Sequence, residues 1–141
     1  MISYRFLDEV RTTWIEDVNA LVGELTKQEG GITREQFLLM TMKNRWLVAM
    51  DANEKIVGMA TLIPMLLPTG LIGRIEDVVV LSSEQGNGLG RELLSRLIVE
   101  AKRSRMKFVT LTSKPERTSA NALYIKLGFV RFETNNYRLV F

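Results

Sequence analysis

Residues Ile75 to Lys102 read IEDVVVLSSEQGNGLGRELLSRLIVEAK, which predicts a strand, a loop and a helix in direct succession. The run Val78–Leu81 is continuous and apolar, as is typical of a strand covered on both faces. From Leu89 to Ala101 the apolar residues recur at helical spacing and the charged residues fall elsewhere, so an amphipathic helix follows. A glycine-rich loop, Gln85–Gly90, joins the two elements.

This loop has the composition of a phosphate-binding turn. Its three glycines allow positive φ and close approach of the backbone, so several amide N–H groups can converge on one anion at the positive end of the helix. A P-loop closes with Gly-Lys-Ser or Gly-Lys-Thr, whereas Gly90 is followed by Arg91-Glu92. Arg91 also stands where a dinucleotide fingerprint needs its third glycine. The pattern therefore favours a phosphate-bearing ligand other than these, with a nucleotide as the weakest alternative.

Two blocks of residues resemble the GNAT superfamily of N-acetyltransferases. Gln85, Gly88 and Gly90 match the pattern Gln/Arg-x-x-Gly-x-Gly/Ala of the acyl-CoA pyrophosphate loop. Residues Ala120–Phe129 match the second block, A-x-x-L-Y-x-K-x-G-F, and with the Ile75–Val78 lead-in the resemblance covers roughly the C-terminal half. It implies an α/β fold: a twisted mixed sheet of about six to seven strands, flanked by about four helices, with central strands splayed around acetyl-CoA.

Composition limits the chemistry that is open to the chain. The 141 residues, 46% hydrophobic and 25% charged, suit one globular domain over residues 1–141. There is no Cys and no His, which excludes disulfides, thiol nucleophiles, His-containing triads and nearly every zinc site, so we expect no metal. The net charge of +3 is dispersed, and no apolar run approaches about 18 residues, so we expect neither nucleic-acid nor membrane binding and a cytoplasmic location.

Apolar periodicity and turn residues predict the order of the elements. Strands are expected at residues 2–7, 46–50, 56–65, 71–81 and 108–112, with a closing hairpin of 130–132 and 137–141. Helices are expected at residues 15–25, after a capping box of Thr33 and Gln36, at 89–103 and at 120–127. The strands at 46–50 and 56–65 should form an antiparallel pair, and the strand, helix and strand from residue 71 to 112 a parallel unit.

Glu76 and Asp77 interrupt an apolar strand, where a carboxylate is costly unless it is paired or faces a cavity. Adjacent strand residues point to opposite faces, so the two acids should have different roles. We interpret Glu76 as a general base, acting directly or through water, and Asp77 as a substrate-contacting or structural acid. The alternative is that both are solvated or paired with Arg74.

Tyr124 is the strongest catalytic candidate, because the tyrosine at this place in the GNAT superfamily assists the departing thiolate. The alternative is a core aromatic on the last helix. Asn121 lies one turn earlier on the same face and can bind pantetheine or backbone. The superfamily more often has an asparagine where this chain has Arg117, a departure that leaves Arg117 free to pair with a phosphate instead.

The resemblance also implies the residues that bind acetyl-CoA. Backbone N–H groups of the loop should hold the pyrophosphate, those of the central strand should stabilise the oxyanion, and Thr112 should line the pantetheine cleft. The residues concerned are Val78, Val79, Val80, Gln85, Gly86, Asn87, Gly88, Leu89, Gly90, Arg91, Thr112, Asn121 and Tyr124.

The implied reaction is direct attack of a primary amine on acetyl-CoA in a ternary complex, since the absence of Cys excludes a cysteine acyl-enzyme. The acceptor class stays open among small-molecule amines, amino sugars and protein amines, although Ile75–Asp77 and Glu133–Tyr137 also look similar to glucosamine-6-phosphate N-acetyltransferases. A non-catalytic acyl-CoA-binding or sensing module is the alternative function. Tyr137–Phe141 is an apolar terminal strand that predicts a possible homodimer.

Overall fold

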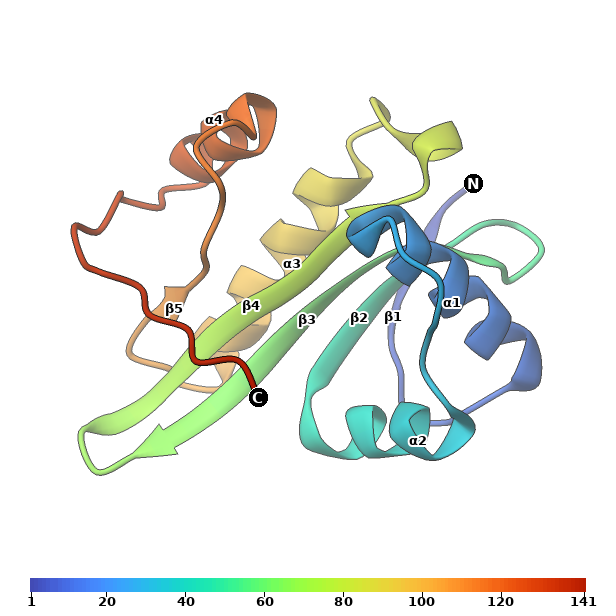
Figure 1. The fold of residues 1–141 in the computed structure, drawn as a ribbon, viewed down its shortest axis with the longest axis horizontal. Coiled ribbons are helices and arrows are strands. Elements are labelled where there is room, and N and C mark those ends of the chain that lie inside the picture. The colour runs from blue at the N-terminus through green and yellow to red at the C-terminus, as the bar shows by residue number, and fades with distance from the viewer. The chain divides into compact units, whose positions relative to one another are not determined.

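The computed structural model describes residues 1–141, which divide into two units, Met1–Leu111 and Thr112–Phe141 (Figure 1). We describe each unit by itself. The first unit contains β1 (Ser3–Phe6), α1 (Thr12–Thr26), α2 (Arg34–Lys43), β2 (Arg45–Met50), β3 (Ile56–Leu67), β4 (Gly70–Val80), a short 3₁₀ helix (Ser82–Glu84), α3 (Leu89–Arg103) and β5 (Val109–Thr110). The second unit contains α4 (Thr118–Lys126).

The first unit is built on a five-stranded mixed sheet in the order β1-β2-β3-β4-β5. The first four strands pair antiparallel, and β5 pairs parallel to β4. The expected antiparallel pair of β2 and β3 and the parallel unit of β4, α3 and β5 are both confirmed. The α/β class is confirmed as well, with five strands in place of the six to seven expected.

The missing strands are those of the closing hairpin, and this prediction was wrong. Residues 130–132 and 137–141 form no strand, and Val130, Phe132, Tyr137 and Leu139 are exposed. The strand expected at 108–112 is also shorter, because only Val109 and Thr110 pair with β4. Alternating apolar residues show that a segment is able to pair, but a strand forms only where a partner edge lies beside it.

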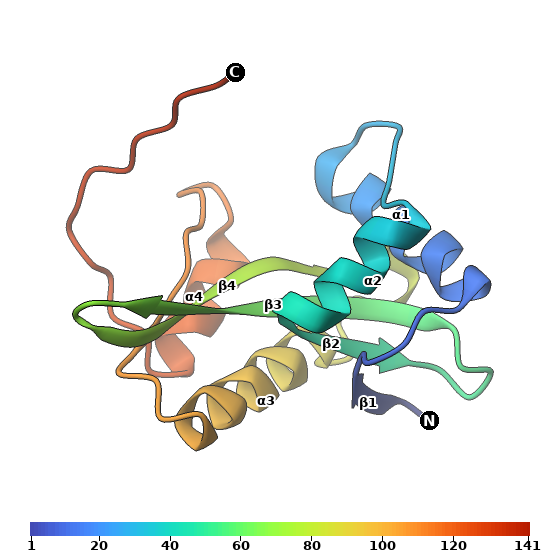
Figure 2. The same cartoon turned by 90° about the horizontal axis from the view of Figure 1, so that it is seen from below.

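The helices of the first unit cover both faces of its sheet, with α1 and α2 on one side and α3 on the other (Figure 2). The α1/α2 face holds a hydrophobic core, in which the rings of Phe37 and Trp46 pack at 4.6 Å between centroids. On the opposite face α3 buries Leu89, Leu93, Leu94, Leu97 and Ala101. Each fully buried leucine contributes about 1.5–3 kcal/mol, so the helix that follows the glycine loop is firmly anchored.

Candidate functional site

Strand β4 carries a β-bulge in the middle of its pairing with β3. Two residues, Asp77 and Val78, lie opposite a single residue, Ala60. Asp77 has a φ of 53°, in the left-handed region that Asp adopts more readily than most non-glycine residues. Bulges bend a strand and change the direction of a side chain, and they are frequent beside active sites. The sequence pattern did not predict this bulge.

From Ile75 onward β4 has a free edge within the first unit. The parallel ladder with β5 consists of two pairs, Gly73 with Val109 and Arg74 with Thr110. From Ile75 to Val80, therefore, β4 pairs with β3 on one side and with no strand on the other. This opening agrees with the expected splay of the central strands, and it exposes backbone N–H and C=O groups to a bound molecule.

The glycine loop links the end of β4 to the start of α3. The side-chain Nε2 of Gln85 donates to the carbonyl oxygen of Val80 at 3.2 Å, which holds the loop against the strand end. Gly86 and Gly88 have φ values of 85° and 79°, a conformation that strains any other L-residue. These two glycines turn the chain from the strand into the helix.

The start of α3 has no side-chain cap. Gly88 is the N-cap residue, and the first helical hydrogen bond of the turn runs from Glu92 N to Gly88 O at 3.0 Å. The amide N–H groups of the preceding first turn therefore have no partner in the helix. A Cβ built at Gly86, Gly88 or Gly90 would meet no atom within 4 Å, so the space around the loop is open. This arrangement fits an anionic group such as a pyrophosphate.

Glu76 and Asp77 lie beside the free edge. The Glu76 carboxylate accepts a hydrogen bond from Arg74 Nε at 2.5 Å, so the pairing that the sequence left open is present. Asp77 forms none of the structure's ion pairs. Desolvation, together with the neighbouring charge of Glu76, raises the pKa of Asp77 above its ordinary value. The two acids therefore differ in environment: one is paired with a cation and one is not.

The remaining sequence candidates belong to the second unit. Tyr124 lies on α4 with 7% of its surface exposed, and its ring meets that of Phe129 edge-on at 5.9 Å between centroids. The side-chain Nδ2 of Asn121 donates to the backbone oxygen of Lys114 at 3.0 Å, which matches the backbone-binding alternative. Arg117 is the N-cap residue of α4, and Thr112 begins the unit. Next to it, Ser113 Oγ is buried with no hydrogen-bond partner.

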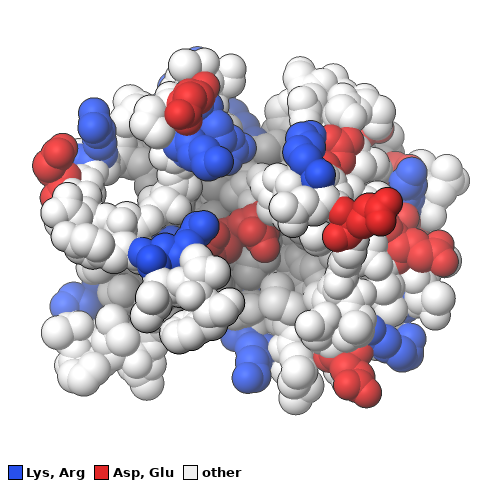
Figure 3. Space-filling model, in the orientation of Figure 1, with Lys and Arg blue, Asp and Glu red and all other residues white.

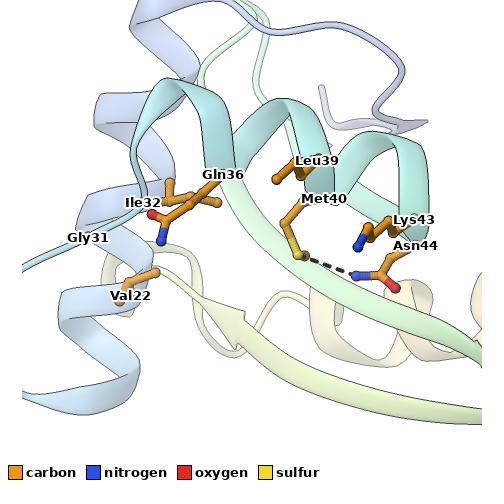
Figure 4. Close-up of a pocket in the computed structure, with 8 residues that line it drawn as sticks. All are labelled: Val22, Gly31, Ile32, Gln36, Leu39, Met40, Lys43 and Asn44. Atoms are coloured by element: carbon orange, nitrogen blue, oxygen red, sulfur yellow. Dashed lines mark hydrogen bonds between the residues drawn. The ribbon is translucent and has the colours of Figure 1, made fainter.

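A pocket of about 470 Å³ lies between α1, the following loop and α2, and sequence analysis missed it (Figure 4). Its lining residues are Val22, Gly31, Ile32, Gln36, Leu39, Met40, Lys43 and Asn44. The signal for it was the composition of α2, which carries Leu38, Leu39 and Met42 on its exposed surface in addition to the buried Phe37. A helix that is apolar beyond its core-facing stripe often borders a binding surface.

The surface charges show no concentration of one sign on the face drawn in Figure 3, where basic and acidic side chains are interspersed. No group of three or more His, Cys, Asp or Glu side chains is placed to hold a metal ion. None of the helices has the length and hydropathy needed to cross a membrane.

Comparison with known proteins gives a consistent result. The family model described as the acetyltransferase (GNAT) family matches residues 2–129. An uncharacterized N-acetyltransferase of Pyropia yezoensis, ycf52, is 35% identical over 57% of this chain and 43% of its own length. A protein of Oryza sativa subsp. japonica named probable glucosamine 6-phosphate N-acetyltransferase 2 is 41% identical over 43% of this chain and 35% of its own length. Both matches thus span less than half of the relative.

A solved structure shows the same fold over the whole chain. The crystal structure of a Trypanosoma brucei acetyltransferase superposes with a TM-score of 0.82, covers 100% of both chains and is 25% identical in sequence.

Proposed function

This chain belongs to the acetyltransferase (GNAT) family, and on that premise we propose that it transfers an acetyl group from acetyl-CoA to a primary amine. One observation carries the choice of donor: an uncapped helix start, α3, follows directly from the free edge of β4. The helix start can bind a pyrophosphate, and the free strand edge offers backbone groups to an extended pantetheine arm. Transfer by direct attack in a ternary complex agrees with a chain that has no Cys.

In this proposal the loop supplies the phosphate contacts. Backbone N–H groups from Gln85 to Arg91 bind the pyrophosphate, and the guanidinium of Arg91 adds positive charge. Those backbone N–H groups of the Val78–Val80 segment that face the free edge of β4 stabilise the thioester oxygen, where negative charge develops. Thr112 contacts pantetheine, whereas the Asn121 amide binds the backbone oxygen of Lys114. The open space around the three loop glycines supports this arrangement, because a phosphate needs close approach to the backbone.

The chemical step needs a proton acceptor and a proton donor. The amine nitrogen attacks the thioester carbon, the new C–N bond forms and the C–S bond breaks. Glu76 takes the proton that the amine loses, and Tyr124 gives a proton to the departing sulfur. Arg74 keeps the Glu76 carboxylate in place through the bond at Nε, and Asp77 contacts the incoming substrate.

The acceptor class stays a proposal: an amine on a small molecule, an amino sugar or a protein. The rice relative is named for glucosamine 6-phosphate, which supports an amino sugar as one member of the test panel. A homodimer formed through Tyr137–Phe141 and a cytoplasmic location also stay predictions. The exposure of Tyr137 and Leu139 supports the first, since apolar side chains on a terminal segment favour association.

The first test is isothermal titration with acetyl-CoA, NAD and ATP, followed on the same sample by a free-thiol assay with a panel of amines. We expect acetyl-CoA alone to bind, and thiol release with at least one amine. Acetyl-CoA binding without thiol release from any amine would instead favour the binding or sensing module. Comparable affinity for ATP or NAD would contradict the assignment of the loop.

Two variants test the assigned roles. Glu76→Gln and Tyr124→Phe should each lower kcat by about 100-fold with little change in the Kd of acetyl-CoA, because each removes a proton-transfer group. Matched controls are Glu9→Gln, an exposed acid paired with Arg5 at 2.8 Å, and Tyr4→Phe on β1. Equal losses in control and test variants would mean that neither side chain has a role in proton transfer.

A further inference from the structure

The pocket between α1 and α2 has an apolar lining with one charged side chain. Val22, Ile32, Leu39 and Met40 supply the apolar surface, and no Asp or Glu lines it. Lys43 is the one ionised lining residue, and it lines the pocket together with the neighbouring Asn44 (Figure 4). Pockets of this kind, apolar with a few polar groups, bind the apolar part of a ligand and orient it by its polar end.

The two other polar side chains of the pocket, Gln36 and Asn44, each have one end of the amide bonded within the fold. Gln36 Oε1 accepts from the backbone N–H of Thr33 at 2.9 Å, as part of the cap of α2. Asn44 Nδ2 donates to Met40 Sδ at 3.3 Å. Lys43 forms none of the structure's ion pairs. The complementary ligand group is therefore an anion, because it would meet an unpaired ammonium and no carboxylate.

The pocket lies on the same face of the sheet as Glu76. Trp46 of β2 pairs with Thr61 of β3, and Thr61 pairs with Glu76 of β4, so the three side chains project to one side. The ring of Trp46 packs on Phe37 of α2, which places α2 on that side too. Trp46 on β2 and Glu76 on β4 are therefore two strand spacings apart, which is about 10 Å.

We propose that this pocket binds the non-reacting end of the acyl acceptor, and that the acceptor is an amine on an apolar body that ends in a carboxylate or similar anion. The proposal rests on the acetyl transfer proposed above. The amine lies at Glu76, the apolar body lies over Leu39 and Met40, and the anion pairs with Lys43. A hydroxyl-rich acceptor fits this lining poorly, because the apolar side chains offer its hydroxyl groups no hydrogen bonds and only Gln36 and Asn44 each have one free amide end.

The first test compares three amines of equal chain length in the thiol-release assay: 8-aminooctanoate, octylamine and 1,8-diaminooctane. We expect kcat/KM to fall in that order, with about tenfold between the amino acid and the diamine, because the second amine meets Lys43. Equal rates for the three, or no turnover of 8-aminooctanoate while another amine is acetylated, would overturn the proposal. Acetyl transfer would then stand, since it depends only on thiol release with some amine.

A charge reversal separates binding from folding. Lys43→Glu should invert the order and make 1,8-diaminooctane the better substrate, an outcome that a merely damaged fold does not produce. Lys55→Glu, in the exposed turn between β2 and β3, is the matched control and should keep the wild-type order. An unchanged order in Lys43→Glu would overturn the pairing with Lys43. If that variant does not fold, Lys43→Gln should abolish the preference for the carboxylate.

Direct binding provides a readout that does not depend on turnover. Octanoate, which has no amine, is titrated into protein with ¹³C-labelled methionine methyl groups in the presence of CoA. The methyl signal of Met40 should shift and that of Met106, outside the pocket, should not. No shift at Met40 would overturn the proposal, whereas failure of CoA itself to bind would overturn the proposed acetyltransferase function.

Discussion

The two helices α2 and α3 begin in opposite ways. At α2 the Thr33 hydroxyl accepts from Gln36 N at 3.2 Å, and Gln36 Oε1 accepts from Thr33 N at 2.9 Å, so the start is closed by its own side chains. At α3 the N-cap residue is Gly88, and no side chain satisfies the first turn. The same physical requirement, partners for the first N–H groups, is met by side chains in α2 and is left open in α3.

The chain leading into α3 also has the more unusual backbone. Asp77, Gly86 and Gly88 all have positive φ within a dozen residues of the helix start. Backbone strain and unsatisfied groups both reduce stability, and they persist where the surrounding structure holds them in place. Here α3 is held by its buried leucines, so this region can keep an open start that an isolated helix would lose.

The largest effect on acetyl-CoA affinity should come from placing a negative charge at the uncapped start of α3. Gly90→Glu puts a carboxylate beside the expected phosphate position, so acetyl-CoA should bind about 100-fold more weakly by isothermal titration. The fold should be unaffected, because an acidic residue in the first turn suits the helix dipole. The control is Gly90→Ala, which meets no atom within 4 Å and should keep affinity within about threefold. Equal losses in both variants would mean that any side chain at residue 90 blocks binding sterically, and that the negative charge is not the cause.

A smaller effect is expected from straining the turn. Gly88→Ala places a Cβ on a residue with φ of 79°, which costs about 1–2 kcal/mol of folding free energy although the space is open. Thermal unfolding should show a lower Tm for Gly88→Ala and an equal or higher Tm for Gly90→Ala, since Ala favours a helix. Equal Tm values for Gly88→Ala and Gly90→Ala would contradict the strained geometry of the loop.

At the capped start of α2, a substitution should affect the stability of the fold and not the binding of acetyl-CoA. Thr33→Ala removes the cap of α2 and should cost about 1 kcal/mol in denaturant unfolding. Acetyl-CoA affinity should not change, because the cap lies on a helix remote in sequence from the loop. A parallel loss of affinity would show that the two helix starts are coupled, and would weaken the contrast between them.

The smallest effect concerns Asp77. Its raised pKa means that the folded state binds this proton more tightly than the unfolded chain does. The favourable contribution is therefore present at low pH and is lost as pH rises through the folded pKa. Asp77→Asn should raise the Tm at neutral pH, and the gain should vanish at acid pH. A gain that is independent of pH would trace the effect to the left-handed backbone of residue 77 instead, since Asn also adopts it readily.

Much of the first unit could be predicted because its signals are local. The helix over Leu89–Arg103 follows from apolar spacing, the cap of α2 from Thr33 and Gln36, and the turn between β4 and α3 from its glycines. Each of these depends on residues that are close in sequence. The bulge at Asp77 left no comparable signal, because it depends on how β4 pairs with β3. Pairing with Arg74 was one of the alternatives for Glu76 and Asp77, and the structure has it at Glu76.

The amino-acid sequence was sufficient to place the glycine loop between strand and helix and, together with the Ala120–Phe129 block, to indicate a GNAT acetyltransferase. Tertiary structure alone decided that β4 has a free edge from Ile75, that residues 130–141 form no hairpin, and that a pocket with an unpaired Lys43 lies between α1 and α2. The physical reason is that a strand edge or a pocket exists only through the elements placed beside it. Hydrophobic periodicity records which face of an element is buried, but it does not record which neighbour covers that face.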